Sequence, residues 1–208
     1  MKYDGIIFDL DGTLWDSTRT VADSWNASMK SLGEECCFTA EDIAGIMGCT
    51  DKQIEKKLFD GYGERAHGLC KACMSEEPPY VAVHGGRIYE GAEAMLEALS
   101  AQKPLFIVSN CQSGYVEAFL SYSGYGRYFR DYEYQGRQGL SKAENIGLIM
   151  QRHHLENCVY VGDTAHDAHS AHSAGCDFVY AAYGFGSCDE YEAVIESPAQ
   201  LFSTLAEM

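Results

Sequence analysis

Basic residues are scarce in this chain. Among its 208 residues, Lys and Arg number 15 while Asp and Glu number 31, which gives a formal charge of −16. A surface this acidic repels nucleic-acid backbones and anionic membranes, so we expect neither as a partner. Because it also repels phosphorylated molecules at long range, a site for such a molecule would need local lysines or arginines, or a metal ion.

Long apolar runs are absent as well. No segment approaches the ~20 apolar residues that cross a bilayer, and Met1-Lys-Tyr-Asp4 leads into a strand rather than into the apolar stretch of a signal peptide. The nine cysteines are an odd number without a regular framework. These features predict a reducing, cytoplasmic location. Cys70 and Cys73 form a lone Cys-x-x-Cys, which we interpret as a pair of buried thiols.

The apolar residues that are present, 46% of the chain, are enough for a substantial core. Short apolar runs typical of buried strands occur at about 5–10, 104–109, 158–162 and 177–182, and segments with helical periodicity, such as 93–99 and 142–150, lie between them. This alternation predicts an α/β fold with a Rossmann-like parallel sheet and helices on both faces.

The connection between the first two of these strands is unusually long. It spans about 90 residues, whereas a crossover between parallel strands needs about a dozen. Helices are predicted within it at 17–32, after the capping box that begins at Thr39, at 51–59 and at 64–75. Prolines cannot continue a helix, so Glu76-Glu-Pro-Pro79 is interpreted as the linker that leaves this insert. We therefore predict a core of residues 1–15 and 84–208 with an inserted helical subdomain of residues 16–83.

Two acidic side chains follow the first predicted strand directly. Asp9 and Asp11 come after the apolar stretch Gly5-Ile-Ile-Phe8, and a glycine follows them. The carboxyl edge of an open α/β sheet is where such folds bind ligands. Two carboxylates that are buried together repel each other unless a cation or a shared proton lies between them. A hard divalent ion such as Mg²⁺ meets this requirement.

Four motifs follow one another along the chain: Asp9-Leu-Asp-Gly-Thr13, Ser109 at the end of an apolar run, Lys142 within Gly139-Leu-Ser-Lys-Ala143, and Gly162-Asp-Thr-Ala-His-Asp167. In this order they resemble the motifs of the haloacid dehalogenase superfamily of phosphatases, in the branch of phosphoglycolate phosphatases and beta-phosphoglucomutases with a helical cap. Lys142 departs from the Lys-Pro common among phosphoglycolate-phosphatase-like relatives. The resemblance implies that the helical insert closes over the site as a cap.

The resemblance also implies a role for each motif residue. Asp9 would be the nucleophile, which as an ionised carboxylate needs no separate base. Asp11 would protonate the leaving oxygen and then deprotonate the attacking water. Ser109, with the backbone at Asn110, would hold the phosphoryl group where a strand gives way to a helix. Lys142 would bridge the nucleophile and the phosphate.

The same resemblance implies a Mg²⁺ site made of oxygen ligands. Asp9, the backbone carbonyl of Asp11 and Asp163 would bind the ion directly, and Asp167 would hold a metal-bound water or orient the other ligands. His166, His169 and His172 recur every three residues nearby. Steps of three drift around a helix and no cysteine is in register with them, so a zinc site is disfavoured, although His166 could touch the rim of the site.

A short segment of the insert is a candidate for substrate recognition. In cap-bearing relatives the loop that corresponds to Gly48-Cys-Thr50 reaches into the active site, which would make Thr50 a substrate-binding residue. The alternative interpretation is local: Gly48 ends one helix and Thr50 begins the next. Both can hold together, because a loop with capped ends is rigid.

Three functions are compatible with these features. The first is a Mg²⁺-dependent phosphomonoester hydrolase, similar to phosphoglycolate phosphatase, that acts on a small phosphorylated metabolite as a monomer or weak homodimer. The second is a phosphomutase of the beta-phosphoglucomutase type, which would need cationic cap groups for a second phosphate. The third is a non-catalytic regulatory protein on this fold. The retained charged residues argue against the third, and the lack of arginine in the segment 48–51 favours hydrolysis.

Overall fold

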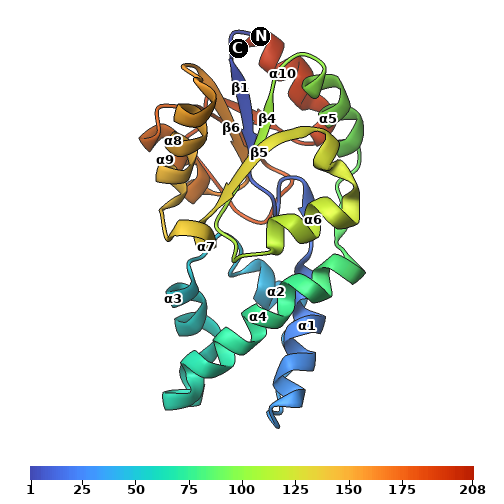
Figure 1. Cartoon of the computed structure of the whole chain (residues 1–208), viewed down its shortest axis with the longest axis vertical. Coiled ribbons are helices and arrows are strands. Elements are labelled where there is room, and N and C mark those ends of the chain that lie inside the picture. Colours follow the sequence, from blue (N-terminus) through green and yellow to red (C-terminus); the bar gives the residue numbers. More distant parts are fainter.

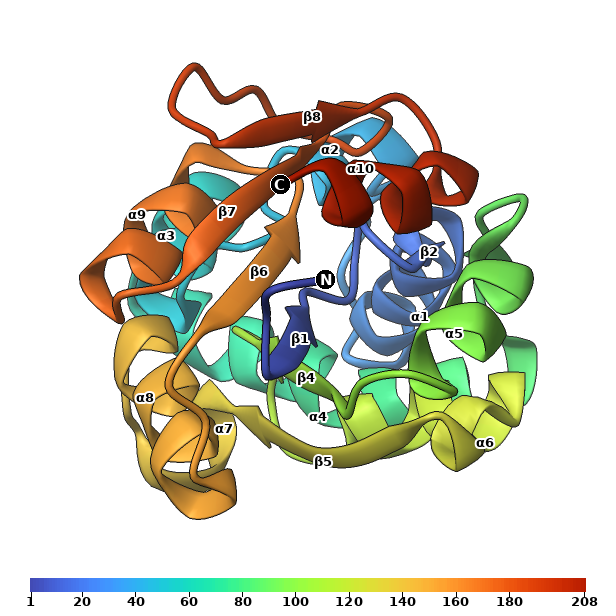
Figure 2. The same cartoon turned by 90° about the horizontal axis from the view of Figure 1, so that it is seen from above.

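The computed structural model describes all of residues 1–208, and its centre is a six-stranded sheet (Figures 1 and 2). The strands lie in the order β5-β4-β1-β6-β7-β8. Their bounds are β1 Gly5–Phe8, β4 Leu105–Ser109, β5 Phe129–Tyr134, β6 Cys158–Gly162, β7 Asp177–Ala181 and β8 Ala193–Ile195. Every pair of neighbouring strands is parallel, so the predicted α/β fold is confirmed.

The four apolar runs in the sequence are four of these six strands. β1, β4 and β6 are buried at every residue, which is why they read as continuous apolar runs. The two missed strands, β5 and β8, form the two edges of the sheet. β5 reads Phe-Arg-Asp-Tyr-Glu-Tyr and β8 has only three residues, so neither carries the apolar run of a central strand.

Helices cover both faces of the sheet and bury two separate apolar clusters. On one face lie α5 (Ala92–Ser100), α6 (Tyr115–Ser123) and α10 (Leu201–Glu207), which contribute to the larger cluster. On the other face lie α8 (Lys142–His153) and α9 (Ala165–Ser173), which pack on side chains such as Ile7 and Phe106 (Figure 2). The short helix α7 (Gln135–Gln138) connects β5 to α8. Because the strands are all parallel, their carboxyl ends share one edge of the sheet.

The long insert forms helices beyond that edge, at the opposite end of the molecule from the two termini (Figure 1). They are α1 (Thr18–Ser31), α2 (Ala40–Ala44), α3 (Asp51–Ile54) and α4 (Ala66–His84), which we call the cap helices. A π-helical turn, Glu55–Phe59, and a 3-10 segment, Asp60–Arg65, connect α3 to α4. The predicted capping box at Thr39 is present, with its Oγ1 accepting from the backbone N–H of Asp42 at 3.1 Å.

The interpretation of Glu76-Glu-Pro-Pro79 as a linker was wrong, because Pro78 and Pro79 lie inside α4. A proline within a helix cannot donate to the carbonyl four residues earlier, which for Pro78 is that of Met74. Gln112 replaces the missing donor from outside the helix, since its Nε2 lies 3.3 Å from the Met74 carbonyl oxygen. The helix ends instead at Gly85, whose φ of 67° is left-handed.

The chain passes between sheet and cap helices twice, and the two passages pair as a ribbon. β2 (Trp15–Asp16) and β3 (Arg87–Ile88) are antiparallel. Arg87 and Asp16 form an ion pair at 3.1 Å across the ribbon. The Trp15 ring is fully buried and stands edge-on to Phe119 of α6, with the ring centres 4.9 Å apart. The ribbon is thus anchored on the sheet side.

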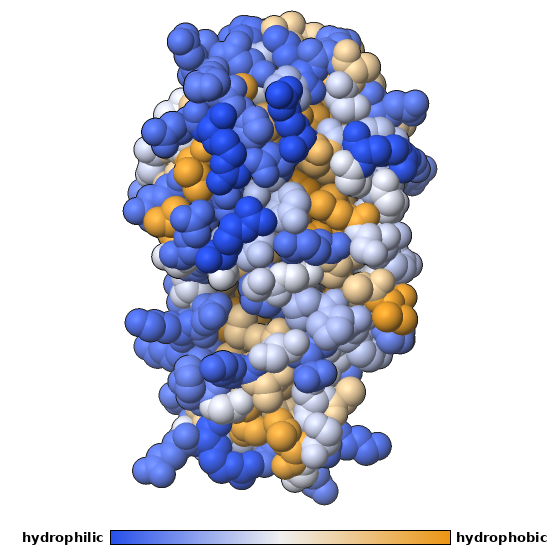
Figure 3. All heavy atoms as spheres, in the orientation of Figure 1, coloured by the Kyte–Doolittle hydropathy of each residue, from blue (hydrophilic) through white to orange (hydrophobic).

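The face drawn in Figure 3 is mostly hydrophilic, with apolar atoms in small separate groups. This agrees with a composition in which acidic residues outnumber basic ones 31 to 15. None of the helices combines the length and the apolar character that crossing a membrane requires.

Candidate active site

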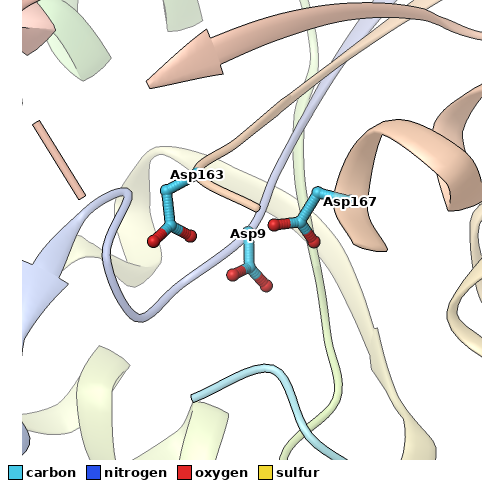
Figure 4. Close-up of side chains that lie close together, drawn as sticks. All are labelled: Asp9, Asp163 and Asp167. Carbon is cyan, nitrogen blue, oxygen red and sulfur yellow. The ribbon is translucent and has the colours of Figure 1, made fainter. Parts of the chain in front are cut away.

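The predicted motif residues meet at the carboxyl edge of the sheet. Asp9 follows β1, Ser109 ends β4, and Asp163 follows β6. Asp167 reaches the same place from the first turn of α9. Figure 4 shows these three carboxylates turned toward one another, and their ligand atoms lie within 4.8 Å of one another. The order of parallel strands thus brings together residues that are far apart in the sequence.

Lys142 supplies the positive charge of this cluster. It is the first residue of α8, and its side chain is 1% exposed. Its Nζ lies 2.8 Å from Asp9 Oδ1 and 2.6 Å from Asp167 Oδ1. Burial by itself lowers a lysine pKa, but the carboxylates of Asp167 and Asp9 outweigh it and hold the pKa of Lys142 well above its usual value. The lysine is therefore charged at neutral pH.

One ammonium does not neutralise three carboxylates. Burial raises the pKa of Asp9 to about 6 and that of Asp163 to about 8, with Lys142 opposing the rise in both cases. Asp163 Oδ2 accepts a hydrogen bond from the backbone N–H of Phe185 at 2.7 Å, whereas its Oδ1 is buried without a donor. An orphaned carboxylate oxygen that faces other carboxylates fits an oxygen-liganded divalent cation. The donor set suits Mg²⁺ better than zinc, which favours nitrogen and sulfur.

The loop after Asp11 must pass very close to this cluster. Gly12 has φ +82°, and a Cβ at this position would lie 2.2 Å from Asp163 Oδ2. Any side chain here would therefore displace the carboxylate as well as strain the backbone. The glycine of the first motif is explained by this contact.

The Asp167 carboxylate is held from both sides. Its Oδ2 accepts from the backbone N–H of Thr164 at 3.0 Å and from the Thr164 hydroxyl at 2.7 Å, as part of a capping box. Its Oδ1 accepts from Lys142. Both oxygens of Asp167 are therefore engaged, an arrangement in which a carboxylate can orient its neighbours.

Asp11 lies next to the cluster but bonds to different partners. Its Oδ1 accepts from Ser17 Oγ at 2.6 Å and from Tyr115 OH at 2.9 Å. Burial raises the pKa of Asp11 to about 7, against the effect of these two donors. A carboxyl group that exchanges its proton near neutral pH can serve as both acid and base. Ser17 and Tyr115 were not predicted, because nothing in their sequence neighbourhoods distinguishes them.

The cap helices close the other side of the site and leave a cavity of about 60 Å³. Met47, Gly48 and Cys49 of the loop between α2 and α3 line this cavity together with Asp9 and Asp11. Thr50 is not among the lining residues. Its hydroxyl donates to Gln53 Oε1 at 3.0 Å, so the structure gives Thr50 the local role of beginning α3 and places Cys49 in the cavity instead.

Two amide side chains of the loop after Ser109 connect the sheet to the cap helices. Asn110 Nδ2 donates to the Gly48 carbonyl at 3.1 Å, and Gln112 Nε2 donates to Glu77 Oε1 at 2.8 Å. Glu77 also accepts from the indole N–H of Trp25 at 2.6 Å. Glu77 was missed because it lies in the segment that we interpreted as a linker.

The remaining candidates are not members of the carboxylate cluster. His166, His169 and His172 are exposed, and none belongs to a group of side chains arranged to hold a metal ion. His172 pairs with Glu192 at 3.1 Å. Cys70 and Cys73 are buried and free, as predicted, and burial raises the pKa of each thiol to about 12.

Residues 6–181 match the sequence model of a family described as haloacid dehalogenase-like hydrolase. The chain is 26% identical to a phosphoglycolate phosphatase of Photobacterium profundum, over 96% of this chain and 94% of that protein. It is 25% identical to a 5'-nucleotidase of Pseudomonas aeruginosa, over 93% of this chain and 89% of that protein.

Solved structures share the fold. A haloacid dehalogenase-like family hydrolase from Streptococcus pneumoniae superimposes with a TM-score of 0.83 at 22% identity, covering 97% of this chain and 98% of that one. A predicted phosphoglycolate phosphatase from Haemophilus somnus gives a TM-score of 0.82 at 22% identity, covering 99% of both chains.

Proposed function

Because the chain belongs to the haloacid dehalogenase-like hydrolase family and is one of its phosphatases, we propose that it hydrolyses a small phosphomonoester through a phosphorylated Asp9, with Mg²⁺ as its metal. This activity would resemble that of a phosphoglycolate phosphatase in its chemical steps. The observation that carries the proposal is the buried ion pair between Asp9 and Lys142, beside two further carboxylates. Such a pair keeps a buried nucleophile ionised at neutral pH.

In the first step, a carboxylate oxygen of Asp9 attacks the phosphorus atom and the bond to the leaving oxygen breaks. Asp11 gives its proton to that oxygen, so the leaving group departs as an alcohol. In the second step, Asp11 takes a proton from a water molecule as the water oxygen attacks the phosphorus of phosphorylated Asp9. Inorganic phosphate leaves and both carboxyl groups return to their starting states. The near-neutral pKa of Asp11 suits both transfers.

Positive charge and hydrogen-bond donors would hold the phosphoryl group during these steps. Ser109 ends β4 beside Asp9, and the chain then turns through Asn110 toward α6. A hydroxyl and backbone N–H groups at this turn suit a phosphoryl group. Lys142 would contact the transferred group while it neutralises Asp9.

The residues around the orphaned Asp163 oxygen would hold Mg²⁺. Asp9, Asp163 and the backbone carbonyl of Asp11 are the proposed ligands, and Asp167 would orient them. When bound, the ion would offset the repulsion between the carboxylates and the phosphate and so favour attack.

We also propose that residues 16–83 act as a cap over a core of residues 1–15 and 84–208. Two hydrogen bonds between the core and residues 16–83 support this proposal: Asn110 contacts Gly48, and Gln112 contacts Glu77. Both core residues closely follow Ser109, the proposed phosphate-binding residue. The loop after Ser109 would thus both bind the phosphoryl group and hold the cap in position.

The proposal is tested with p-nitrophenyl phosphate and Mg²⁺. We expect steady release of phosphate by the wild type and a loss of about three orders of magnitude or more in Asp9→Asn. Mass spectrometry of acid-quenched wild type should find a phosphoryl group on the peptide that contains Asp9. Asp23→Asn, which removes an exposed aspartate of α1, is the matched control and should keep full activity. Turnover by Asp9→Asn at a tenth of the wild-type rate would overturn the mechanism.

A further inference from the structure

The wall that the cap helices contribute to the active-site cavity carries one charged side chain, and it is an acid. Seventeen residues line the cavity, and no lysine, arginine or histidine is among them. On the cap side, Glu77 is the only ionisable carboxyl group, and its neighbours in this wall are mostly apolar, such as Val21, Ile43 and Met74. The leaving group of a substrate would occupy this side while its phosphoryl group lies at Asp9.

Glu77 is arranged as an acceptor without a counter-ion. It is 6% exposed. Its Oε2 accepts from Trp25 Nε1 at 2.6 Å, and its Oε1 accepts from Gln112 Nε2 at 2.8 Å. Both donors are neutral, and each carboxylate oxygen keeps a free lone pair. Burial raises the pKa of Glu77 to about 7, against the effect of these donors.

No cationic side chain on the cap side of the cavity offsets the negative charge of Glu77. Lys57 contacts the loop between α2 and α3, where its Nζ lies 2.9 Å from the Gly45 carbonyl and 3.4 Å from Cys49 Sγ. It is exposed and does not line the cavity. Lys142 is committed to Asp9 and Asp167 on the sheet side.

These features discriminate between leaving groups by their charge. A carboxylate or a second phosphate would lie beside Glu77 without a cation, in a small and poorly solvated space where like charges repel strongly. A protonated amine would provide the counter-ion that Glu77 lacks and could donate to its free lone pairs. An alkyl group would leave Glu77 as it is.

We propose that the substrate is a phosphomonoester of a small amino alcohol, whose ammonium group pairs with Glu77 while its phosphoryl group meets Asp9. This inference rests on the proposed phosphatase function. It differs from what the names of the relatives suggest, because phosphoglycolate carries a carboxylate in the position where this site presents an acid.

Four esters of similar size test the proposal: phosphoethanolamine, 2-hydroxyethyl phosphate, ethyl phosphate and phosphoglycolate. With wild type and Mg²⁺ at a pH of about 8, we expect kcat/KM to be highest for phosphoethanolamine, about tenfold above ethyl phosphate, and lowest for phosphoglycolate. The proposal is overturned if phosphoglycolate or the neutral hydroxyl ester equals or exceeds phosphoethanolamine.

Glu77→Gln tests the role of the residue, because it keeps the shape and an acceptor oxygen but removes the charge. We expect the ratio of kcat/KM for phosphoethanolamine over ethyl phosphate to fall about tenfold. Glu76→Gln removes the charge of the exposed neighbour on the same helix and should keep the wild-type ratio. An unchanged ratio in Glu77→Gln, with thermal stability retained, would overturn the assignment.

The outcomes also separate this inference from the function on which it rests. If p-nitrophenyl phosphate is hydrolysed in an Asp9-dependent manner but the esters rank differently, only the assignment of Glu77 fails. If no ester is hydrolysed, including p-nitrophenyl phosphate, the phosphatase mechanism fails and the substrate assignment with it. A melting curve recorded before the assays checks that the wild-type protein is folded, so that a lack of activity is not due to an unfolded cap.

Discussion

At the scale of single residues, the site is a set of carboxyl groups whose surroundings push their proton affinities apart. Asp11, with two hydroxyl donors, has a pKa of about 7, and Asp163, with one orphaned oxygen, has a pKa of about 8. Lys142 acts mainly on Asp9 and Asp167. In the proposed mechanism the same residue type would therefore serve as nucleophile, proton carrier and metal ligand according to its neighbours.

Tyr115→Phe tests the proton-carrying role of Asp11. Its hydroxyl donates to Asp11 Oδ1 and lowers the pKa of that carboxyl, so removing it should raise the pKa. Asp11 must be protonated to serve the leaving group, hence the alkaline limb of the kcat profile should move up by roughly half to one pH unit. Tyr191→Phe, at an exposed tyrosine, is the control. A limb that stays in place would argue that Asp11 is not the acid.

Asp163→Asn tests the metal ligand through stability. The pKa of Asp163 rises on folding from 3.8 to about 8, so the folded state binds its proton more tightly. Stability from this group is fully present below about pH 4 and is lost as pH rises through about 8. In EDTA at pH 8, Asp163→Asn should therefore unfold with a free energy higher than the wild type by on the order of 2 kcal/mol.

Mg²⁺ should reverse the order of stability of the wild type and Asp163→Asn. Mg²⁺ should raise the melting temperature and restore the activity of EDTA-treated wild type, and it should do neither for Asp163→Asn. Ca²⁺ should not restore activity, because its looser coordination misplaces the attacking carboxylate. Full activity of the metal-free wild type would contradict the proposed site.

At the scale of elements, α4 is the unusual feature, because it continues through two prolines. Pro78 is buried and packs beside Gly114, where a Cβ would lie 3.4 Å from the Pro78 Cβ. Pro79, by contrast, is exposed. The helix tolerates Pro78 because Gln112 occupies the freed carbonyl of Met74. The sequence predicted that the helix would end at these prolines, but a hydrogen bond from another element allows α4 to continue.

Pro79→Ala should therefore stabilise the protein. It restores a backbone donor for the carbonyl four residues earlier, and this gain of up to about 3 kcal/mol exceeds the roughly 1 kcal/mol lost through a more flexible unfolded chain. We expect a net gain of about 1–2 kcal/mol in chemical denaturation. Pro198→Ala is the contrasting control, because Pro198 begins a helical turn, where proline is favourable. A loss of stability in Pro79→Ala would contradict this account of α4.

At the scale of the whole molecule, the formal charge of −16 opposes the approach of any phosphate. Lys142 places one positive charge among the carboxylates of Asp9, Asp163 and Asp167, so the proposed Mg²⁺ would have to supply the further positive charge that attracts a phosphate. Exposed ion pairs such as that of Arg127 with Glu93 change little in this long-range field. With the proposed metal bound, the molecule would combine a repulsive surface with a locally attractive site.

Salt should accordingly help the reaction with a dianionic ester. At constant Mg²⁺, kcat/KM for p-nitrophenyl phosphate should rise about two- to threefold between roughly 10 and 150 mM NaCl, because screening weakens the repulsion. Phosphoethanolamine, which carries a compensating positive charge, should show a smaller rise. A decrease with salt for p-nitrophenyl phosphate would show that a positive field near the site outweighs the surface charge.

The central fold, and the positions of the candidate site residues in it, could be predicted from the sequence. Buried parallel strands must be continuously apolar, so β1, β4 and β6 stood out, and Asp9, Ser109 and Asp163 could be placed at their ends. The edge strands β5 and β8 lack this signal because half of their surroundings is solvent. Local chemistry also sufficed for the capping box at Thr39.

The tertiary structure alone decided which side chains adjust the site. Ser17 and Tyr115 meet at Asp11, and Trp25 and Gln112 meet at Glu77, across separations of up to 104 residues. Local sequence patterns do not predict these hydrogen bonds, because a hydroxyl or amide residue looks the same in the sequence whether it faces water or a buried carboxylate. The continuation of α4 through Pro78 follows the same rule, since its replacement donor lies in another element.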